Sequence, residues 1–217
     1  MKIGVLGTGS VGQTIATKLV ELGHDVMLGS RTANNEKAVE WAKTSKGSAG
    51  TFEQTAALGE ILFNCTLGAG SIEALHMAKE NNLAGKILID VSNTLDFSKG
   101  FPPSLLVCNT DSLGEQIQRA FPTLKVVKTL NTMWAGLMVN PRMLPDSHVN
   151  FVCGNDAAAK TTVKILLKTF GWRDDEFVDL GDITAARGVE SWLPLWVRIY
   201  GATQNGAFNL KLVSAKR

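Results

Sequence analysis

The N-terminal stretch limits the possible folds of this 217-residue chain more than any other feature. An apolar segment at residues 3–6 leads into the sequence G-T-G-S-V-G at residues 7–12, after which apolar side chains recur at helical spacing. Glycines placed in this way between a strand and a helix are typical of a βαβ unit that binds a dinucleotide. Gly7 permits a tight turn, Gly9 leaves room for a pyrophosphate, and Gly12 allows the helix to pack closely on the strand. The free N–H groups at the helix N-terminus then attract the phosphates.

The end of the second strand indicates which dinucleotide is bound. Residues 26–28 continue into Gly29, Ser30, Arg31 and Thr32, without the Asp or Glu that NAD sites usually carry there. A carboxylate would repel a 2′-phosphate, whereas Arg31 can pair with it and cover the adenine, and the two hydroxyl groups add donors. The sequence therefore predicts NADP(H). The alternative is a solvated arginine in a polar loop.

The composition excludes several classes of function. The chain has 22 Lys+Arg against 20 Asp+Glu, so its charge does not indicate a nucleic-acid or acidic-membrane partner. No apolar run approaches the roughly 20 residues needed to cross a bilayer, and the chain opens on a strand without a signal-peptide pattern. Cys65, Cys108 and Cys153 are far apart within apolar runs. We interpret them as buried thiols in a reducing cytoplasm, with no disulfide and no metal site.

Strand and helix patterns alternate along the rest of the chain. The predicted strands span residues 61–65, 86–91, 125–128 and 150–153. The predicted helices cover residues 35–46, 72–78, 112–121 and 156–170. This alternation predicts an α/β fold with a doubly wound, mostly parallel sheet that is covered by helices on both faces. Two prolines in residues 140–145 mark a seam, so we expect one domain, 1–217, made of a nucleotide-binding core, 1–146, and a C-terminal strand/helix lobe, 147–217.

Three further strand ends are expected to line the ligand site, because ligands of doubly wound sheets bind beyond the carboxyl ends of the strands. The residues at these ends are Thr66, Leu67, Ser92, Asn93, Asn131, Thr132 and Met133. Their small polar side chains and main-chain groups suit a ribose and a carboxamide. For Ser92 and Asn93 a simple turn is an equally good interpretation.

The sequence contains no evident catalytic acid or base, and we leave the catalytic residues unassigned. Enzymes that transfer a hydride to or from a nicotinamide usually place such a group beside the hydride path. His24, His76 and His148 each fit a structural role better. A substrate that accepts a hydride without local acid–base help is a flavin-like ring, which needs mainly to be positioned against the nicotinamide.

The C-terminal segment offers an aromatic surface for such a ring. Trp192, Trp196 and Tyr200 recur at a spacing of four residues and form one helical stripe, near a proline that starts or kinks the helix. One interpretation is a core or dimer-interface stripe, and the other is the wall of an acceptor pocket. Both hold if the pocket lies at a subunit interface. The candidate acceptor-pocket residues are Trp134, Trp192, Leu193 and Pro194.

The glycine motif, together with four further segments, resembles one family over nearly the whole chain. These segments are L-G-H-D-V at 22–26, G-S-R-T at 29–32, F-V-C-G-N at 151–155 and V-E-S-W-L-P-L at 189–195. The chain resembles the NADP oxidoreductase family of the coenzyme F-420-dependent type, which includes NADPH-dependent deazaflavin reductases, and is similar to the NADPH-binding domains of transmembrane metalloreductases.

The resemblance implies a Rossmann-type fold with a small C-terminal helical lobe, and hydride exchange between NADP(H) and a deazaflavin or flavin. It also implies that NADP is held by Thr8, Ser10, Val11, Ser30 and Arg31. One departure concerns the acceptor. The deazaflavin reductases carry a Leu-His-Thr type of sequence where this chain has L-N-T at 130–132, which is closer to the metalloreductase domains.

From these observations we expect a cytoplasmic NADP(H)-dependent oxidoreductase whose acceptor is a deazaflavin (coenzyme F-420), a flavin or a small quinone-like ring. The alternative is an NADP(H)-binding module or redox sensor without turnover of its own. A small imine or hydroxy-acid reductase would require a dimer to complete its pocket. The aromatic stripe and the resemblance point to a homodimer, and we expect neither nucleic acid nor membrane as partner.

Overall fold

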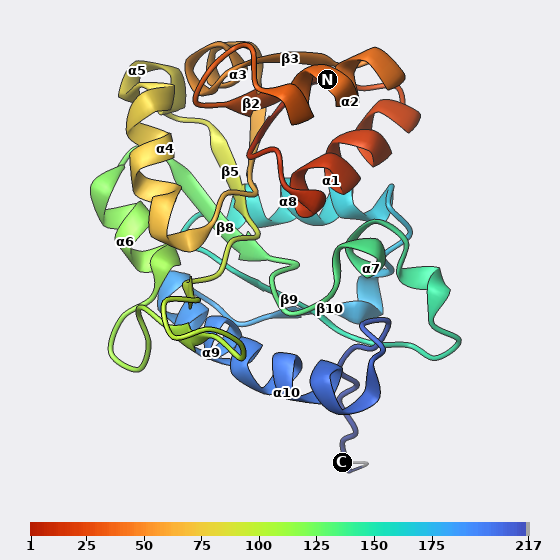
Figure 1. Cartoon of the computed structure of the whole chain (residues 1–217). Coiled ribbons are helices and arrows are strands. Elements are labelled where there is room, and N and C mark those ends of the chain that lie inside the picture. The colour runs from red at the N-terminus through yellow and green to blue at the C-terminus, as the bar shows by residue number, and fades with distance from the viewer. Residues whose placement is uncertain (216–217) are drawn as a thin grey trace.

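A computed structural model describes residues 1–215, which fold around one eight-stranded sheet in the order β10-β9-β8-β5-β4-β1-β2-β3 (Figure 1). The strands are β1 Lys2–Leu6, β2 Asp25–Ser30, β3 Ser48–Thr51, β4 Ile61–Asn64, β5 Ile87–Asp90, β8 Lys125–Thr129, β9 Asn150–Cys153 and β10 Phe177–Asp179. A separate antiparallel pair joins β6 Leu95–Asp96 to β7 Ser104–Leu105. The last two residues of the predicted lobe, 216 and 217, lie outside the described residues.

The direction of the strands confirms the predicted doubly wound, mostly parallel fold. The strands from β3 across to β8 are all parallel, whereas β9 runs antiparallel to β8 and β10 runs parallel to β9. The chain winds outward from β1 to β3, returns to β4 beside β1, and then winds the other way. The order therefore reverses between β1 and β4, which is where ligands of such sheets bind.

Helices cover both faces of the sheet (Figure 1). On one face lie α1 Ser10–Glu21, α2 Glu36–Thr44, α7 Ala135–Val139 and α8 Ala157–Lys168. On the other face lie α3 Phe52–Leu58, α4 Ser71–Ala78, α5 Glu80–Leu83 and α6 Leu113–Ala120. The C-terminal helices are α9 Ala186–Ser191 and α10 Leu193–Thr203, and the short 3-10 turns are η1 Gly68–Gly70, η2 Pro141–Met143, η3 Asp174–Glu176 and η4 Ile183–Ala185.

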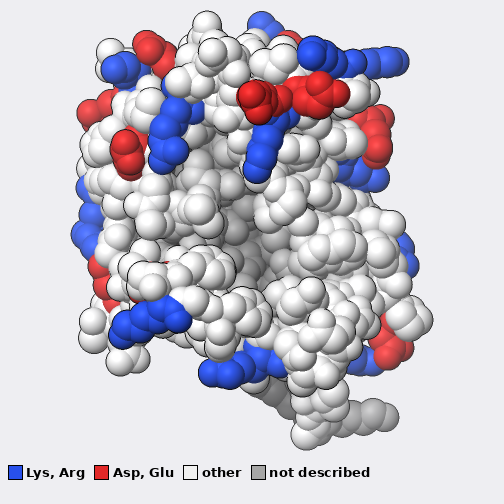
Figure 2. All heavy atoms as spheres, in the orientation of Figure 1, with Lys and Arg blue, Asp and Glu red and all other residues white. Residues whose placement is uncertain are grey.

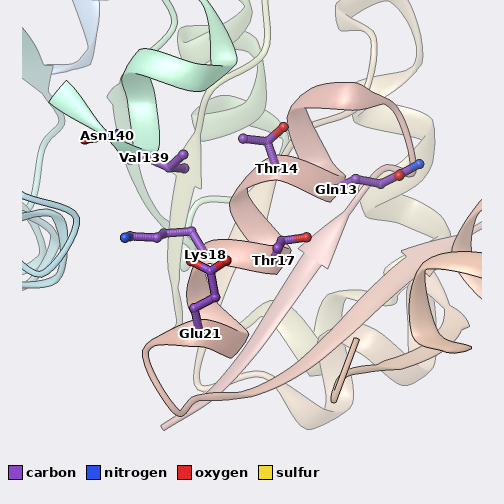
Figure 3. Close-up of a pocket in the computed structure, with 7 residues that line it drawn as sticks. All are labelled: Gln13, Thr14, Thr17, Lys18, Glu21, Val139 and Asn140. Carbon is purple, nitrogen blue, oxygen red and sulfur yellow. The ribbon is translucent and has the colours of Figure 1, made fainter. Parts of the chain in front are cut away.

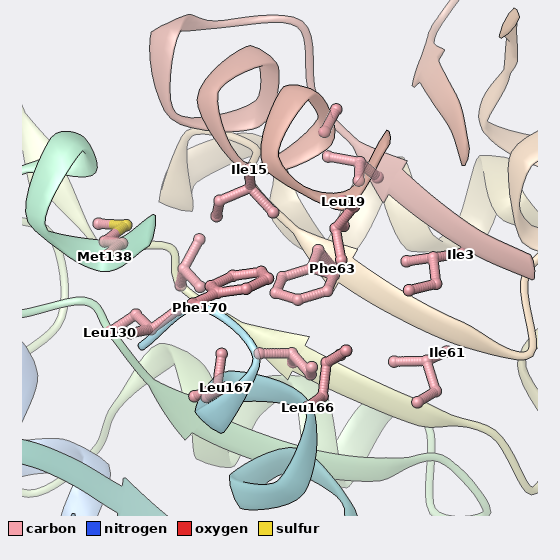
Figure 4. Close-up of a cluster of buried hydrophobic side chains, with 14 of the residues drawn as sticks. Ile3, Ile15, Leu19, Ile61, Phe63, Leu130, Met138, Leu166, Leu167 and Phe170 are labelled. Carbon is pink, nitrogen blue, oxygen red and sulfur yellow. The ribbon is translucent and has the colours of Figure 1, made fainter. Parts of the chain in front are cut away.

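The alternation of side chains along the strands builds two separate cores. On β4, Ile61 and Phe63 point into the core under α1 and α8, and Leu62 points into the core under α3, α4 and α6. Figure 4 shows the first core, where Leu19 of α1 and Phe170 after α8 lie near Phe63. Strands buried on both faces read as continuous apolar runs, which is why the sequence predicted them well.

Four features differ from the sequence analysis or extend it. Strand β3 and helix α3 were not predicted, although Thr51 and Gln54 form a capping box at the start of α3. The seam at 140–145 contains the turn η2, and β9 beyond it belongs to the main sheet. The expectation of three buried thiols is confirmed for Cys153, but Cys65 is only partly buried and Cys108 is exposed because it lies in the irregular segment after β7. No helix within residues 1–215 is long and apolar enough to cross a membrane.

Candidate functional site

A cavity of about 480 Å³ opens at the carboxyl ends of β1, β2, β4 and β5. Figure 2 shows a hollow in the middle of this face, with uncharged residues around its floor and Lys and Arg side chains at its upper rim. The predicted cofactor residues that line the cavity are Gly7, Thr8, Gly9, Ser10, Val11, Ser30, Arg31, Thr66, Leu67, Ser92 and Asn93. Those outside the lining are Gly12, Thr32, Asn131, Thr132 and Met133.

The glycine loop has the shape that a pyrophosphate requires. Gly7 has a φ of +115°, and a Cβ on Gly12 would overlap the carbonyl oxygen of Gly7, so α1 packs directly on the turn. A Cβ on Gly9 would meet no protein atom within 4 Å, which leaves open space beside the loop. Gly9 is also the N-cap of α1, and no side chain caps this helix. Its first N–H groups can therefore bind phosphate oxygens.

The end of β2 places one cation at the mouth of the cavity. Arg31 is exposed, and its Nη2 would lie 3.7 Å from a Cβ on Gly70, so the guanidinium reaches from β2 toward η1. The buried hydroxyl of Ser30 donates to the carbonyl oxygen of Thr32 at 2.6 Å. Asn35, which sequence reasoning missed as a lining residue, caps α2 by accepting from the N–H of Ala38 at 3.1 Å.

The ends of β4 and β5 share a buried polar network below the cavity. Asn64 donates to the carboxylate of Asp90 at 2.9 Å, and Thr66 donates to the Oδ1 atom of Asn64 at 2.7 Å. The Ser92 hydroxyl donates to Asp90 at 2.5 Å, so Ser92 does more than form a turn. Sequence reasoning missed Asn64 and Asp90, although both end apolar strands and stand opposite each other in the sheet register. The hydroxyls of Thr66 and Ser92 donate their protons to hydrogen bonds with Asn64 and Asp90, so toward a ligand each oxygen can act only as an acceptor.

The end of β8 brings the next predicted residues together. Asn93 donates to the carbonyl oxygen of Asn131 at 2.9 Å, and Asn131 donates back to the Asn93 side chain at 2.9 Å. Leu130 has a φ of +62°, and its N–H donates to the side chain of Asn150 at 3.2 Å. The turn after β8 is therefore held beside the end of β5. Met133, which follows this turn, is buried.

The candidate acceptor-pocket residues divide between two places. The indole N–H of Trp192 donates to the carbonyl oxygen of Thr132 at 2.9 Å, which puts the junction of α9 and α10 next to the end of β8. Leu193 is buried and Pro194 is partly buried in the first turn of α10. Trp134 is 44% exposed at the start of α7, and no acceptor-pocket residue lines the cavity itself.

The predicted aromatic stripe is partly internal. Trp196 stacks on Tyr200 with ring centroids 5.6 Å apart and on Phe208 with centroids 5.4 Å apart. A Cβ on Gly206 would lie 3.6 Å from Trp196 and 3.7 Å from Trp134, so the segment after α10 packs between these two rings. The stripe therefore holds α10 against the C-terminal segment, with Tyr200 still 39% exposed.

The titratable groups around the cavity are few. Arg31 is the one charged residue among the described residues of the lining. Burial, helped by the Asp90 carboxylate, raises the pKa of the Cys65 thiol far above its ordinary value, so the thiol is not a nucleophile at neutral pH. His148 is bound through Nε2 to the carbonyl oxygen of Pro141 at 2.9 Å, away from the cavity. Within residues 1–215 no cluster of three or more His, Cys, Asp or Glu could hold a metal ion.

A second, open hollow lies on the outer face of α1, between this helix and the end of α7 (Figure 3). It is lined by Gln13, Thr14, Thr17, Lys18, Glu21, Val139 and Asn140. None of the predicted site residues contributes to it. The hollow runs along α1 from its first turn, where Gln13 donates to the carbonyl oxygen of Thr8 in the glycine loop at 2.9 Å, to its last turn.

Comparison with known proteins points to one group of oxidoreductases. The family model described as NADP oxidoreductase, coenzyme F420-dependent, matches residues 2–94. Metalloreductase STEAP3 of Rattus norvegicus is 30% identical over 201 residues, which is 90% of this chain and 38% of that protein. Metalloreductase STEAP2 of Homo sapiens is 27% identical over 199 residues, which is 89% of this chain and 36% of that protein. The chain therefore spans less than two fifths of the length of these curated relatives.

A solved structure resembles the whole chain. The crystal structure of a candidate F420-dependent NADP-reductase from Arthrobacter sp. FB24 is 50% identical, with a TM-score of 0.93. The likeness covers 99% of this chain and 100% of that one.

Proposed function

The chain belongs to the NADP oxidoreductase family of the coenzyme F420-dependent type, and on that premise we propose that it exchanges a hydride between NADP(H) and a flavin-like ring such as a deazaflavin. The adenosine and phosphates bind in the cavity at the ends of β1 and β2. The nicotinamide extends toward the ends of β5 and β8, and the ring acceptor stacks on it from the side of α10. Each part of this arrangement has its own support.

One observation carries the choice of NADP(H). Arg31 reaches across the mouth of the cavity at the end of β2, and the strand-end segment 29–32 contains no carboxylate that would repel a 2′-phosphate. Beside it, the N-terminus of α1 has no side-chain cap and faces open space at Gly9. A cation for the 2′-phosphate and an uncapped helix for the pyrophosphate match the charge of NADP(H) along the cavity.

The residues near the proposed nicotinamide position act by orientation. When bound, NADPH supplies the hydride, and the acceptor takes up one proton from water as it is reduced. The Asn93–Asn131 pair closes the floor between β5 and β8, and Thr66 and Ser92 offer acceptor oxygens to the nicotinamide half. No carboxylate, lysine or histidine belongs to the described lining, which favours an acceptor that needs only close stacking.

The same proposal extends to the surface that holds the acceptor, to the oligomeric state and to the location in the cell. Trp134, Trp192, Leu193 and Pro194 wall the acceptor, because Trp192 is bound directly to the Thr132 carbonyl oxygen. Exposed Leu195 and Tyr200 on α10 provide apolar surface for a homodimer. Three free thiols support a reducing, cytoplasmic location.

Anaerobic stopped-flow absorbance at the nicotinamide band tests the proposal. Protein loaded with NADPH is mixed with the deazaflavin coenzyme and, separately, with free flavin. Fast, saturable oxidation by the deazaflavin is the expected result. Oxidation by flavin alone would assign the chain to the metalloreductase-like branch. Tight NADPH binding without oxidation by either ring would favour the alternative, an NADP(H)-binding module or redox sensor.

A further inference from the structure

A lysine lies wholly inside the protein, directly below the cavity. Lys128 of β8 has a side chain that is 0% exposed. Its ammonium donates to Asp90 Oδ2 at 2.9 Å and to the Ser92 carbonyl oxygen at 2.6 Å, and it lies 2.8 Å from Glu190 Oε1. These contacts match the three N–H groups that an ammonium can donate. The sequence showed only a polar residue near the end of a strand.

The groups in this buried cluster are ionised, and their opposite charges compensate one another. Burial lowers the pKa of Lys128, but the two carboxylates outweigh burial and raise the pKa above its ordinary value, so the group is an ammonium. One ammonium cannot neutralise two carboxylates, and the remaining negative charge is stabilised by α6. Glu190 accepts from the N–H of Leu113 at 2.9 Å and from the N–H of Gly114 at 3.0 Å. The positive end of the α6 dipole thus faces the carboxylate.

The cluster connects the cavity to the C-terminal helices. On the cavity side, Lys128 touches the backbone of Ser92, which lines the cavity. On the other side, three residues at the end of α9 contact β8 or the turn that follows it. Val189 accepts from Asn131 at 3.2 Å, Glu190 contacts Lys128, and the Trp192 indole donates to the Thr132 carbonyl oxygen.

The physical role of such a cluster is geometric. A buried ion pair often contributes little net stability compared with apolar packing of the same volume, yet each of its partners must stay in place. We propose that Lys128 and Glu190 are positioning residues, which hold α9 and the ends of β5 and β8 in register so that the nicotinamide half of NADP(H) is oriented. The inference rests on the proposed function, and it adds two residues that do not themselves touch the cofactor.

The experiment compares two ligands on Glu190→Gln by calorimetric titration. NADPH spans the whole site, whereas 2′,5′-ADP contains the adenosine half and lacks the nicotinamide. Glutamine keeps one acceptor oxygen for Lys128 and Gly114, which Glu190 Oε1 now serves, but its NH2 group cannot accept from the N–H of Leu113, and no negative charge is left to pair with the ammonium. Affinity for NADPH should fall about tenfold, the effect of one weakened charged hydrogen bond. Affinity for 2′,5′-ADP should remain unchanged.

Glu115→Gln is the matched control. Glu115 pairs with Arg187 and so also joins α6 to α9, but this pair does not reach the strand ends at the cavity. This variant should leave both affinities unchanged. A second variant, Glu190→Asp, keeps the charge but shortens the side chain, so it cannot reach both Lys128 and the α6 amides, and it should weaken NADPH binding selectively as well. It keeps the inference testable if Glu190→Gln does not fold.

Two results would overturn the inference while leaving the proposed function intact. If folded variants bind both ligands as the wild type does and show only a lower melting temperature, the cluster is merely structural. Equal weakening of NADPH and 2′,5′-ADP would mean that the whole cavity had changed. A wild-type protein that binds neither ligand would instead refute the proposed function, together with the inference that rests on it.

Discussion

Arg31→Ala removes the one cation in the described lining of the cavity and tests the cofactor assignment most directly. The side chain leaves the end of β2 and extends toward Gly70 across the cavity mouth, where a 2′-phosphate is expected. It makes no hydrogen bond within the described part of the protein, so its loss should leave the fold unchanged. The substitution therefore separates binding from stability.

The magnitude follows from the type of contact. A hydrogen bond to a charged group contributes about 1.5–3 kcal/mol. This range corresponds to roughly a ten- to a hundredfold loss of NADPH affinity. NADH lacks the 2′-phosphate, so its affinity should be nearly unchanged. Because Arg31 is exposed, the difference between NADPH and NADH should shrink as the salt concentration rises.

Fluorescence titrations of both cofactors at low and high salt provide the assay. Lys18→Ala is the matched control, because it removes the same charge near the C-terminal end of α1, beside the hollow in Figure 3. That variant should bind both cofactors as the wild type does. Equal weakening of NADPH and NADH by Arg31→Ala would refute the 2′-phosphate assignment.

Three further predictions concern the loop, the thiols and one ion pair. Gly9→Val should abolish binding of NADPH and NADH with little change in melting temperature, because its side chain fills only the open space beside the loop. Exposed Cys108 should react with a thiol reagent in the native protein, whereas Cys153, whose pKa burial raises to about 12, should react only on unfolding. The Arg119 guanidinium lowers the pKa of Asp111 to about 2, so the pair stabilises the fold above the ordinary pKa of aspartate and is lost as the pH falls toward 2. Asp111→Asn should therefore lower the free energy of unfolding at neutral pH, and the difference should shrink as the pH falls below the ordinary pKa of aspartate and vanish only below a pH of about 2, as measured by urea denaturation.

Each of these predictions has an outcome that contradicts it. Retained cofactor affinity in Gly9→Val would reject the pyrophosphate site at the loop. Fast native labelling of Cys153 would show that the thiol is accessible. For Asp111→Asn, a stability difference that stays constant down to pH 2 would mean that the carboxylate contributes through its shape and not through its charge.

The local patterns predicted the parts of the site that depend on neighbouring residues. Gly7 and Gly12 act on the backbone a few residues away, so their spacing was enough to indicate the loop and its helix. Strand ends are also local features, and Thr66, Ser92 and Asn93 were correctly expected near one another at one edge of the sheet. Their roles toward the cofactor stay predictions.

Other features were not predicted from the sequence, because they depend on residues that are far apart in the chain. Asn35 was predicted only as the start of a helix, and the return of the chain at β4 made it part of a cavity. The exposed position of Cys108 was missed because its apolar neighbours in the sequence do not pack over it. Lys128 gave no sign of burial, because a lysine near the end of a strand is usually solvated and its partners Asp90 and Glu190 are far away in the sequence.

The sequence by itself determined the doubly wound fold, the glycine loop before α1 and the cation at the end of β2, because glycine geometry, apolar periodicity and a missing carboxylate act within one βαβ unit. Only the tertiary structure decided how the part of the site at the ends of β5 and β8 is held in place. Lys128, Asp90 and Glu190 come from β8, β5 and α9, and they meet because the parallel strands end at one edge and α9 packs across it. A buried charge is tolerated only where its partners converge, and that convergence is a property of the folded chain as a whole.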